Sequence, residues 1–326
     1  MDWNNFNNNY SDDDDRRQEE EFRKGNPEIE MENRAKNSWM MWVPFGIVFV
    51  VQFALSFIAL EFLFTWDAVH FTGDSYMDFA NGIMETVSGT TFNLIVSLAY
   101  AVICGVLFGI WYRRKFYLPA RAAAGDRPRV SVWKKNPLLL AAGVVFLCVG
   151  AQYVCVYLMN ALALLFPSWL MIYQQLMQGI GLDGGNVGIL VALYSMILGP
   201  ITEELTFRGL TLGYGRRAMP FWVANVVQAF LFAALHMNPL QCIYTFAFGL
   251  ILGYVVYRSG SLVLGIVVHM AFNAIGVLFP QMIVMGNNPI TFFLFLLLGM
   301  VLTYAGLTLI GKCSPTAEER AGGNRG

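Results

Sequence analysis

The sequence predicts an all-α fold: a polytopic transmembrane helical bundle of about eight spans, with seven as the alternative count. Composition supports this fold, because 56% of the residues are hydrophobic and only 13% are charged. Soluble domains carry about 25% charged residues. The apolar residues also cluster into runs that approach the roughly 20 residues a helix needs to span a bilayer.

The apolar runs give the predicted order of helices along the chain. Spans five and six are separated only by a tight turn at Asn238-Pro239, and the segment 240–257 is short enough to be tilted or partly buried. The predicted spans are 39–65, 90–112, 137–165, 187–210, 220–238, 240–257, 261–280 and 290–311.

The chain divides into four predicted regions. Residues 1–37 carry a net charge of −5 and almost no apolar side chains, so we predict a disordered acidic tail that cannot offset its chain entropy by burial. The segment 38–135 holds the N-terminal membrane helices and a basic loop. The segment 136–312 holds the membrane domain with the candidate chemistry, and 313–326 is a short tail. The five cysteines form no CxxC pair and resemble small hydrophobic residues.

The distribution of Lys and Arg predicts the orientation of the bundle. The 113–135 connection carries eight basic residues against one Asp, whereas the 66–89 and 166–186 loops contain no Lys or Arg. Cytoplasmic loops are enriched in Lys and Arg. We therefore predict a cytoplasmic 113–135 loop, external 66–89 and 166–186 loops, and both termini in the cytoplasm.

The segment 199–208 places three ionisable side chains on one apolar span. Glu204 and Arg208 share a helix face and can pair, whereas Glu203 is rotated by about 100°. Pro200 can start or kink the helix, and a restarted helix would place its positive end beside Glu203. We predict that Glu204 neutralises Arg208 and that Glu203 is left to act on water. The alternative is a structural ion pair with a solvated Glu203.

Two of the three histidines lie in later apolar spans. His236 follows Phe232 by four residues, and His269 shares a helix face with Asn273. An imidazole can polarise a carbonyl, hold a metal or move a proton, and an Asn amide can hydrogen-bond an oxyanion. For each residue alone, the alternative is a polar contact between helices. His70 lies in an outer loop region and has no assigned role.

Together these residues form the pattern EExxxR, FxxxH, HxxxN in three successive apolar spans. The chain resembles the CPBP family, which comprises intramembrane CaaX proteases of the type II prenyl endopeptidase kind and bacteriocin-processing enzymes, also called the Abi family. The resemblance covers about 187–280, where the order, spacing and helix placement of the motifs all agree with it. Residues 1–135 carry no motif that matches.

The resemblance implies a role for each motif position. Glu203 would activate the attacking water, and His269 with Asn273 would stabilise the oxyanion. His236 would be the histidine of the second motif, and a carboxylate with its buried Arg partner would accompany the base. The implied catalytic residues are Glu203, Glu204, Arg208, His236, His269 and Asn273.

The resemblance leaves two mechanisms open. The family has been described both as metalloproteases and as glutamate-dependent enzymes without a metal. One Glu and two His would make a plausible Zn²⁺ set with a fourth open position, which would use His269 as a ligand and leave Glu204 as the base. We therefore carry both mechanisms forward and assign no metal ligand.

The depth of the motif residues in the membrane poses a geometric problem. A simple topology places Glu203 toward the cytoplasm, while helix rise places His236 about 24 Å along its span from Pro220. Isolated polar groups inside a membrane are costly, so we expect all motif residues except Arg208 to line one cavity. This requires tilted, staggered or kinked spans, or a 211–219 turn that reaches into the membrane.

The predicted function is an intramembrane endopeptidase that hydrolyses a membrane-associated peptide or protein. The alternative is a non-catalytic membrane scaffold or a bacteriocin self-immunity protein of the same family. A transporter is disfavoured, because the sequence shows no internal repeat and the first three spans are almost free of polar residues. The compact topology favours a bacterial cell membrane. We expect the lipid bilayer and a peptide or membrane-protein substrate as partners, and no nucleic acid.

Overall fold

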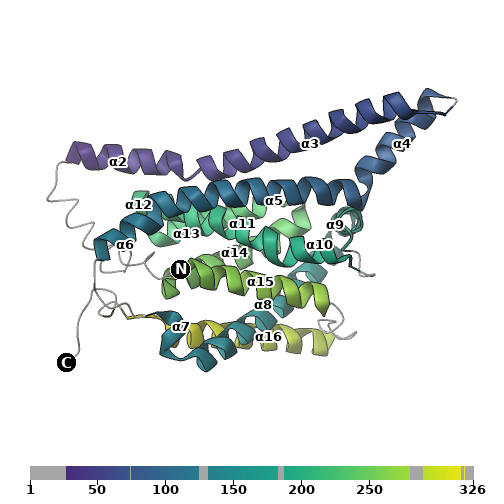
Figure 1. The fold of residues 1–326 in the computed structure, drawn as a ribbon. Helices are drawn as coiled ribbons and strands as arrows, with labels where there is room; N and C mark the ends of the chain where they lie inside the picture. The colour runs from purple at the N-terminus through teal and green to yellow at the C-terminus, as the bar shows by residue number, and fades with distance from the viewer. Residues whose placement is uncertain are drawn as a thin grey trace.

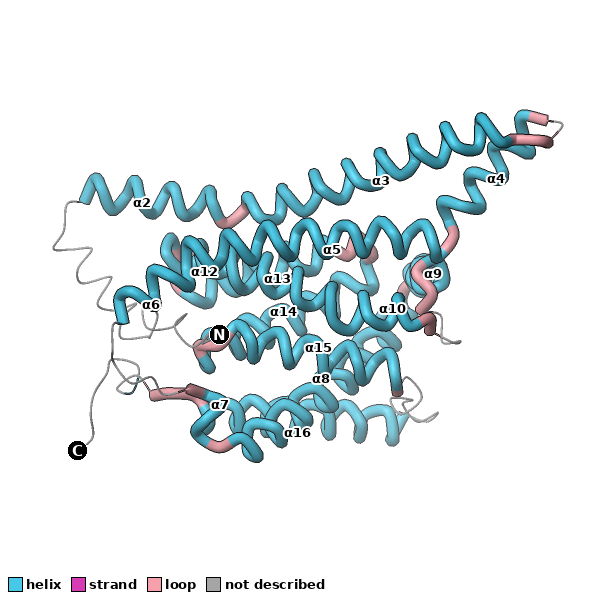
Figure 2. The backbone as a smooth tube through the Cα atoms, in the orientation of Figure 1, coloured by secondary structure: helices cyan, strands magenta, loops and turns pink. Residues whose placement is uncertain are grey.

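The computed structural model describes residues 27–73, 75–124, 131–182, 187–279, 289–316 and 319. Within these ranges the chain is almost entirely helical and contains no strand, which confirms the predicted all-α bundle (Figure 1). Most connections between successive helices are short (Figure 2). Short connections place consecutive helices side by side and antiparallel.

The helices long and apolar enough to cross a membrane agree with the predicted spans. Six meet both criteria in the described part of the chain, and two shorter apolar helices bring the number to the predicted eight. The chain is therefore an integral membrane protein. The six are Glu30–His70, Thr90–Ala122, Pro137–Leu165, Ile189–Ala218, Pro239–Ser259 and Pro289–Cys313, and the two shorter ones are Phe221–Leu235 and Leu262–Leu278.

Several of these spans are composed of consecutive helical segments, including π-helical turns labelled η. The described elements are α2 (Pro27–Met40), α3 (Val43–His70), α4 (Tyr76–Ser88), α5 (Thr90–Tyr112), η2 (Arg113–Tyr117), α6 (Leu118–Ala124), α7 (Val132–Lys135), α8 (Pro137–Leu165), α9 (Pro167–Gly179), α10 (Ile189–Leu193), η3 (Tyr194–Leu198), α11 (Gly199–Glu204), η4 (Leu205–Thr211), α12 (Leu212–Ala218), α13 (Phe221–Leu235), α14 (Pro239–Ser259), α15 (Leu262–Leu278) and α16 (Pro289–Cys313).

Local sequence determines where the helices of the second half begin and end. Asn238 caps α14 by accepting the Gln241 backbone N–H at 3.0 Å, and Pro239 follows at the first helical position. Ser261 caps α15 in the same way. Between these helices Gly260 adopts φ 71°, a left-handed conformation that suits glycine and ends α14. These caps satisfy backbone groups that lipid could not.

Segments predicted as tail or loop contain further helices. The prediction of disorder for residues 27–37 was wrong, because α2 forms there and packs against α12; residues 1–26 lie outside the described part. The 113–135 connection begins as a continuation of α5 through η2 and α6, and the 66–89 and 166–186 connections contain α4 and α9. Polar residues lower the hydropathy of these segments, so they were predicted as loops. The signals that start a helix are nevertheless present: Ser75 accepts the Asp78 backbone N–H at the start of α4.

Apart from the buried Arg208, the described basic side chains of the membrane body lie at one end of the bundle, the end that carries α6, α7 and α12 in Figure 1. We call this the basic end. Its described Lys and Arg residues lie on η2, α6, α7 and the last turns of α12, α14 and α16: Arg113, Arg114, Lys115, Arg121, Lys134, Lys135, Arg216, Arg217, Arg258 and Lys312.

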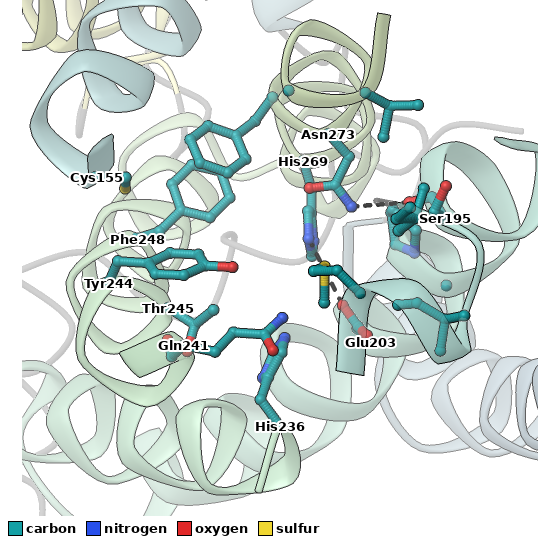
Figure 3. A pocket seen from close by; sticks show the side chains of 18 of the residues that line it. Cys155, Ser195, Glu203, His236, Gln241, Tyr244, Thr245, Phe248, His269 and Asn273 are labelled. Carbon is teal, nitrogen blue, oxygen red and sulfur yellow. Dashed lines mark hydrogen bonds and ion pairs between the residues drawn. The ribbon is translucent and has the colours of Figure 1, made fainter. Parts of the chain in front are cut away.

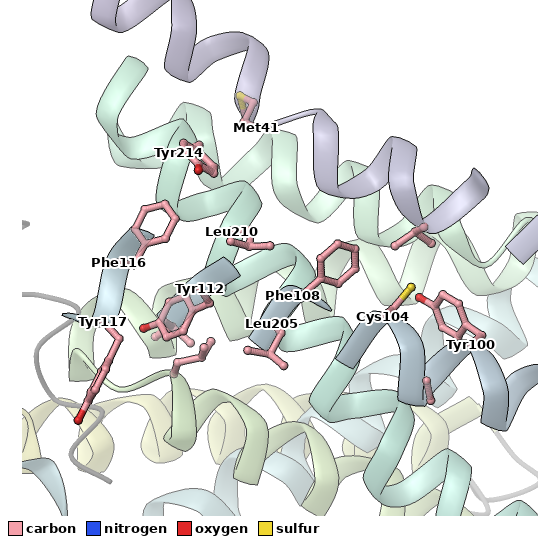
Figure 4. Packing of buried hydrophobic residues seen from close by; sticks show 14 residues of the cluster. Met41, Tyr100, Cys104, Phe108, Tyr112, Phe116, Tyr117, Leu205, Leu210 and Tyr214 are labelled. Atoms are coloured by element: carbon pink, nitrogen blue, oxygen red, sulfur yellow. The ribbon is translucent and has the colours of Figure 1, made fainter. Parts of the chain in front are cut away.

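A cluster of buried apolar side chains joins α5 to the continuous helix Ile189–Ala218, which carries Glu203, Glu204 and Arg208. We call this helix the motif helix. Phe108 and Tyr112 of α5 pack with Leu205 and Leu210 of η4, and Met41 from the turn after α2 joins the same cluster (Figure 4). All five are less than 7% exposed. Burial of this kind holds the motif helix against α5 and sets the position of its polar face.

Close helix contact depends on glycine at several positions. A Cβ on Gly150 of α8 would lie 2.7 Å from the Gly299 carbonyl oxygen of α16, and a Cβ on Gly306 would collide with the backbone of Leu147. In the α13–α14 pair, Gln228 donates to the Gly249 carbonyl oxygen at 3.0 Å and to Asn225 Oδ1 at 2.8 Å. Small residues and buried amides of this kind drive helix association in membranes.

We predict that Gly253→Ala destabilises the protein. A Cβ there would collide with Asn225 Oδ1 and lie 2.7 Å from Gln228 Nε2, so the buried amide pair would have to move. We expect the thermal unfolding midpoint in detergent to fall by about 5 °C or more. Gly46→Ala is the matched control, because nothing lies within 4 Å of a Cβ there, and it should leave the midpoint unchanged or raise it. Equal midpoints for the two variants would refute this packing.

Candidate functional site

A cavity of about 720 Å³ lies among the helices that carry the sequence motifs. Four motif residues line it and point into a common space: Glu203 from α11, His236 from the end of α13, and His269 with Asn273 from α15 (Figure 3). The structure therefore brings together residues from three spans that were predicted to share a cavity. Glu204 and Arg208 are not among the lining residues, so the expectation that Glu204 would line the cavity was wrong.

The depth problem disappears because the motif helix is longer than predicted. It continues to Ala218 instead of ending at 210, which places Glu203 fifteen residues, or about 22 Å, from that end. His236 lies fifteen residues beyond Phe221, where α13 begins. The two side chains are thus at equal distance from the turn that joins their helices. Glu203 consequently lies away from the basic end, not beside it.

Pro200 shapes the helix without interrupting it. The chain stays helical from Ile189 to Ala218, but Gly199 N–H bonds to the Tyr194 carbonyl five residues back, as in a π-helical turn. In the same five-residue pattern, the donor to the Ser195 carbonyl would be the N–H of residue 200, but Pro200 has no N–H. The Ser195 carbonyl is therefore left without a helical partner, and Asn273 Nδ2 donates to it at 2.8 Å.

This arrangement links Asn273 to the motif helix along the cavity wall. Asn273 Nδ2 carries two N–H groups, and the bond to Ser195 uses one of them. The bond orients the amide on the cavity wall and leaves its second N–H for a further acceptor. Ser195 was not predicted from the sequence, because its role comes from a backbone carbonyl that any residue could supply.

Glu204 is the centre of a buried ionic cluster. Its Oε1 atom lies 2.7 Å from Arg208 NH1 and 2.9 Å from His269 Nδ1. The Glu204 and Arg208 side chains are both 0% exposed, and that of His269 is 4% exposed. The predicted pairing of Glu204 with Arg208 is confirmed. The contact of Glu204 with His269 joins helices α11 and α15 and was not predicted.

Further contacts compensate the buried guanidinium of Arg208. Its NH2 group donates to the Gly249 carbonyl oxygen of α14 at 3.3 Å, and its Cζ atom lies 4.3 Å from the centre of the Phe232 ring of α13. A buried cation needs such partners, because the desolvation of an unpaired charge costs several kcal/mol. Arg208 thereby connects three helices behind the cavity wall.

His269 lies between the two carboxylates. Its Nδ1 faces Glu204, and its Nε2 lies 3.6 Å from Glu203 Oε2. A carboxylate accepts hydrogen bonds, so the Nδ1 contact places a proton on that nitrogen. The rings of Phe232 and Phe248 meet the imidazole edge-on, with centroids 5.7 and 5.6 Å away. These contacts hold the ring in one orientation with Nε2 directed toward Glu203.

His236 presents its other nitrogen to the cavity. Its Nδ1 lies 3.0 Å from the Phe232 carbonyl oxygen, and a carbonyl can only accept, so Nδ1 carries the proton. In the neutral ring Nε2 is then a hydrogen-bond acceptor. Glu203, whose side chain is 19% exposed, is the second acceptor in the same cavity. Both acceptors therefore face the same cavity.

Other polar residues of the cavity were not singled out from the sequence. Gln152 donates to the Phe272 carbonyl oxygen at 2.6 Å, while Gln241 and Tyr244 of α14 lie opposite Asn273 (Figure 3). Tyr173 of α9 hydrogen-bonds to Tyr244. A polar residue inside an apolar span was the available signal for Gln152 and Gln241.

Glu203, His236 and His269 are the cavity side chains whose chemistry suits a metal ion. Among the residues that the structure describes, no three His, Cys, Asp or Glu side chains are arranged to hold a metal ion. His269 directs Nδ1 at Glu204 and Nε2 at Glu203.

Comparison with known proteins agrees with the motif assignment. Residues 185–275 match a family model described as "Type II CAAX prenyl endopeptidase Rce1-like". All six motif positions lie inside this segment, so the match agrees with the resemblance that the motifs indicate.

A segment of 96 residues is 35% identical to a protein of Escherichia coli described as an uncharacterized 24.3 kDa protein. It makes up 28% of this chain and 44% of that relative, so the chain spans less than half the length of the curated protein that it matches. No solved structure matches this chain.

We predict that Arg208→Met destabilises the protein strongly, because it leaves Glu204 buried without a cation. Breaking a buried pair from one side typically costs about 3–5 kcal/mol. Expression and the thermal midpoint in detergent should both fall, and adding Glu204→Gln to the same protein should recover part of the loss. Arg114→Met is the control, since Arg114 is exposed on η2. If both single variants melt alike, the ionic cluster does not support the fold.

Proposed function

We propose that this chain, which carries an Rce1-like segment of the CPBP family, is an intramembrane endopeptidase that cleaves a membrane-associated peptide with water activated by Glu203. One observation carries the proposal: a cavity inside an apolar bundle is lined by a carboxylate, two imidazoles and an amide directed toward one another. Peptide hydrolysis needs a base for water and donors for the developing negative charge.

The two neighbouring carboxylates support different roles. Glu204 is fully buried and held by Arg208 and His269, so it is unavailable to a substrate. Glu203 faces the cavity and contacts only His269 Nε2 among these groups, at 3.6 Å. This difference supports Glu203 as the group that accepts a proton from water, with His236 Nε2 as a second acceptor in the same cavity.

The charges of the cluster suggest how the oxyanion is stabilised. Glu203 and Glu204 contribute two negative charges, Arg208 one positive charge, and a proton on His269 Nε2 would balance the remaining charge. His269 and Asn273, which would carry these donors, both line the cavity. We propose that they donate to the carbonyl oxygen of the scissile bond as it becomes negative.

The chemical steps then balance within these residues. Glu203 takes a proton from water, and the oxygen of that water forms a bond to the carbonyl carbon. The tetrahedral intermediate collapses with cleavage of the carbon–nitrogen bond. Protonated Glu203 returns its proton to the leaving amine, so that one water is consumed and two peptide ends are released.

The orientation of the protein follows from the charge distribution. We propose that the basic end faces the cytoplasm of a bacterial cell, with both termini on that side. The cavity then lies in the outer half of the membrane domain, because it is lined by the ends of α5, α8, α14 and α15 that lie away from the basic end. The alternative function, a scaffold or self-immunity protein, would use the same cavity for binding only.

We predict that Glu203→Gln reduces hydrolysis of a reporter membrane peptide by about 10²–10⁴-fold, because the amide cannot accept the proton while the side-chain volume is kept. Purified wild-type and variant proteins in proteoliposomes would be compared by mass spectrometry of the products, with and without a chelator. Glu85→Gln, an exposed acid on α4, is the control and should retain full activity.

The scaffold alternative makes the opposite forecast for the same variants. It would be supported if wild-type protein cleaved no peptide and cells with Glu203→Gln kept the full wild-type phenotype. Loss of wild-type cleavage on addition of a chelator would contradict the metal-free base proposed for Glu203.

A further inference from the structure

The face of α14 that lines the cavity carries polar side chains, although none of the six motif residues comes from this helix. Gln241 is followed by Tyr244 and Thr245, three and four residues on, so the three share one side of the helix, and all of them line the cavity. Thr245 donates its hydroxyl to the Gln241 carbonyl oxygen at 2.8 Å. Gln241 and Tyr244 are therefore the side chains of this face that can offer polar groups to a substrate.

The side-chain oxygen of Gln241 has a hydrogen-bonding capacity that the protein leaves unused. Among the described residues, none donates to Oε1, although this atom is buried. Gln241 hydrogen-bonds to the side chain of Tyr244, and because Oε1 takes no part, Nε2 is the donor and the Tyr244 oxygen the acceptor. This contact fixes which end of the amide is left over. Buried polar groups nearly always have a partner, so a bound molecule is the expected source of a donor for Oε1.

A second amide faces the cavity from α15 with the opposite polarity. Asn273 donates one N–H to the Ser195 carbonyl oxygen at 2.8 Å and keeps the other N–H for a further acceptor. Gln241 and Asn273 lie on opposite sides of the cavity (Figure 3). The cavity therefore offers a donor on one side and an acceptor on the other, and each amide is held in place by a hydrogen bond of its own.

A peptide bond has the matching pattern of groups. It is planar and trans, so its C=O and its N–H point in opposite directions. In the proposed mechanism the carbonyl oxygen of the scissile bond faces Asn273. The N–H of the same bond then points toward α14, where Gln241 Oε1 is an acceptor that lacks a donor.

We propose that Gln241 binds the N–H of the scissile peptide bond and that Tyr244 positions the Gln241 amide for this contact. The proposal rests on the proposed peptidase function and adds a substrate-binding residue outside the six motif positions. The reacting bond is held between two amides, with its carbonyl oxygen toward α15 and its nitrogen toward α14. No bond forms or breaks at Gln241, whose role is to bind and orient the substrate.

The test replaces single peptide N–H groups by oxygen. Ester analogues of one membrane peptide, each lacking one N–H, would be bound to Glu203→Gln protein in nanodiscs, where turnover should be slow. We expect one analogue to bind about tenfold more weakly than the parent peptide, because the Gln241 oxygen then stays buried without a donor. Wild-type protein should cleave the parent at that same bond. The proposal is wrong if no single N–H affects binding, or if the sensitive N–H lies away from the cleaved bond.

Gln241→Met, made in the Glu203→Gln background, identifies the acceptor of this N–H. It removes the oxygen with little change in side-chain length, so the ratio of the two Kd values should fall from about ten toward one. An ester also weakens its own carbonyl as an acceptor, but this effect is common to both proteins and cancels in the comparison. Gln175→Met is the control, because Gln175 is exposed on α9, and it should keep the original ratio. An unchanged ratio in Gln241→Met would show that another group accepts the N–H.

A variant that keeps an oxygen at this position distinguishes binding from a structural role. Gln241→Glu retains an acceptor at the end of the same side chain and should still prefer the parent peptide by about threefold or more. A residue needed only for packing would respond alike to Met and Glu. Tyr244→Phe removes the acceptor of Gln241 Nε2 and should lower the ratio to an intermediate value. If Gln241→Glu has no preference for the parent peptide, Oε1 is not the acceptor.

Binding also separates this proposal from the proposed function, because the Kd ratios do not require turnover. If no protein cleaves any peptide, the peptidase function fails, while the ratios still decide whether Gln241 accepts a peptide N–H. If wild-type protein cleaves the peptide and the ratios do not depend on Gln241, the peptidase function stands and the role of Gln241 is refuted.

Discussion

The buried contact of Glu204 with Arg208 and His269 is the interaction on which the remainder of the site depends. Glu204 neutralises the buried Arg208. It also holds the imidazole of α15 against the motif helix, with Glu204 Oε1 2.9 Å from His269 Nδ1. The neighbouring Glu203 is consequently free to face the cavity. Because neither ion is exposed, the contact is stable only while both partners remain. Glu204 therefore supports the fold and also positions a candidate catalytic residue, His269.

A second constraint acts on the backbone of the same helix. Pro200 and the π-helical turn before it leave the Ser195 carbonyl without a helical donor, and Asn273 supplies one from α15. The motif helix and α15 are therefore connected twice, once by an ionic contact and once by this amide. The Asn273 connection lies on the cavity wall, so the hydrogen bond to the Ser195 carbonyl also positions a candidate oxyanion donor.

Much of the architecture could be predicted from the sequence. Apolar runs gave the eight spans, and spacing gave the Glu204–Arg208 pair, because contacts four residues apart on one helix are local. The position of Glu204 behind the cavity could not be predicted, since it depends on which face α15 presents to α11. Helix α2 was missed because its stability comes from packing against α12 and not from hydropathy. The length of the motif helix, which reaches Ala218, removed the apparent mismatch in depth between Glu203 and His236.

The most direct measurement of the central claim is the fate of the water oxygen. Purified wild-type protein would be incubated with a membrane peptide in ¹⁸O-labelled water, and the newly formed carboxyl end would be analysed by mass spectrometry. The account predicts one ¹⁸O atom at a single new carboxyl terminus in the wild-type reaction, and intact peptide with the Glu203→Gln protein. Labelled product formed equally well by the Glu203→Gln protein would contradict it.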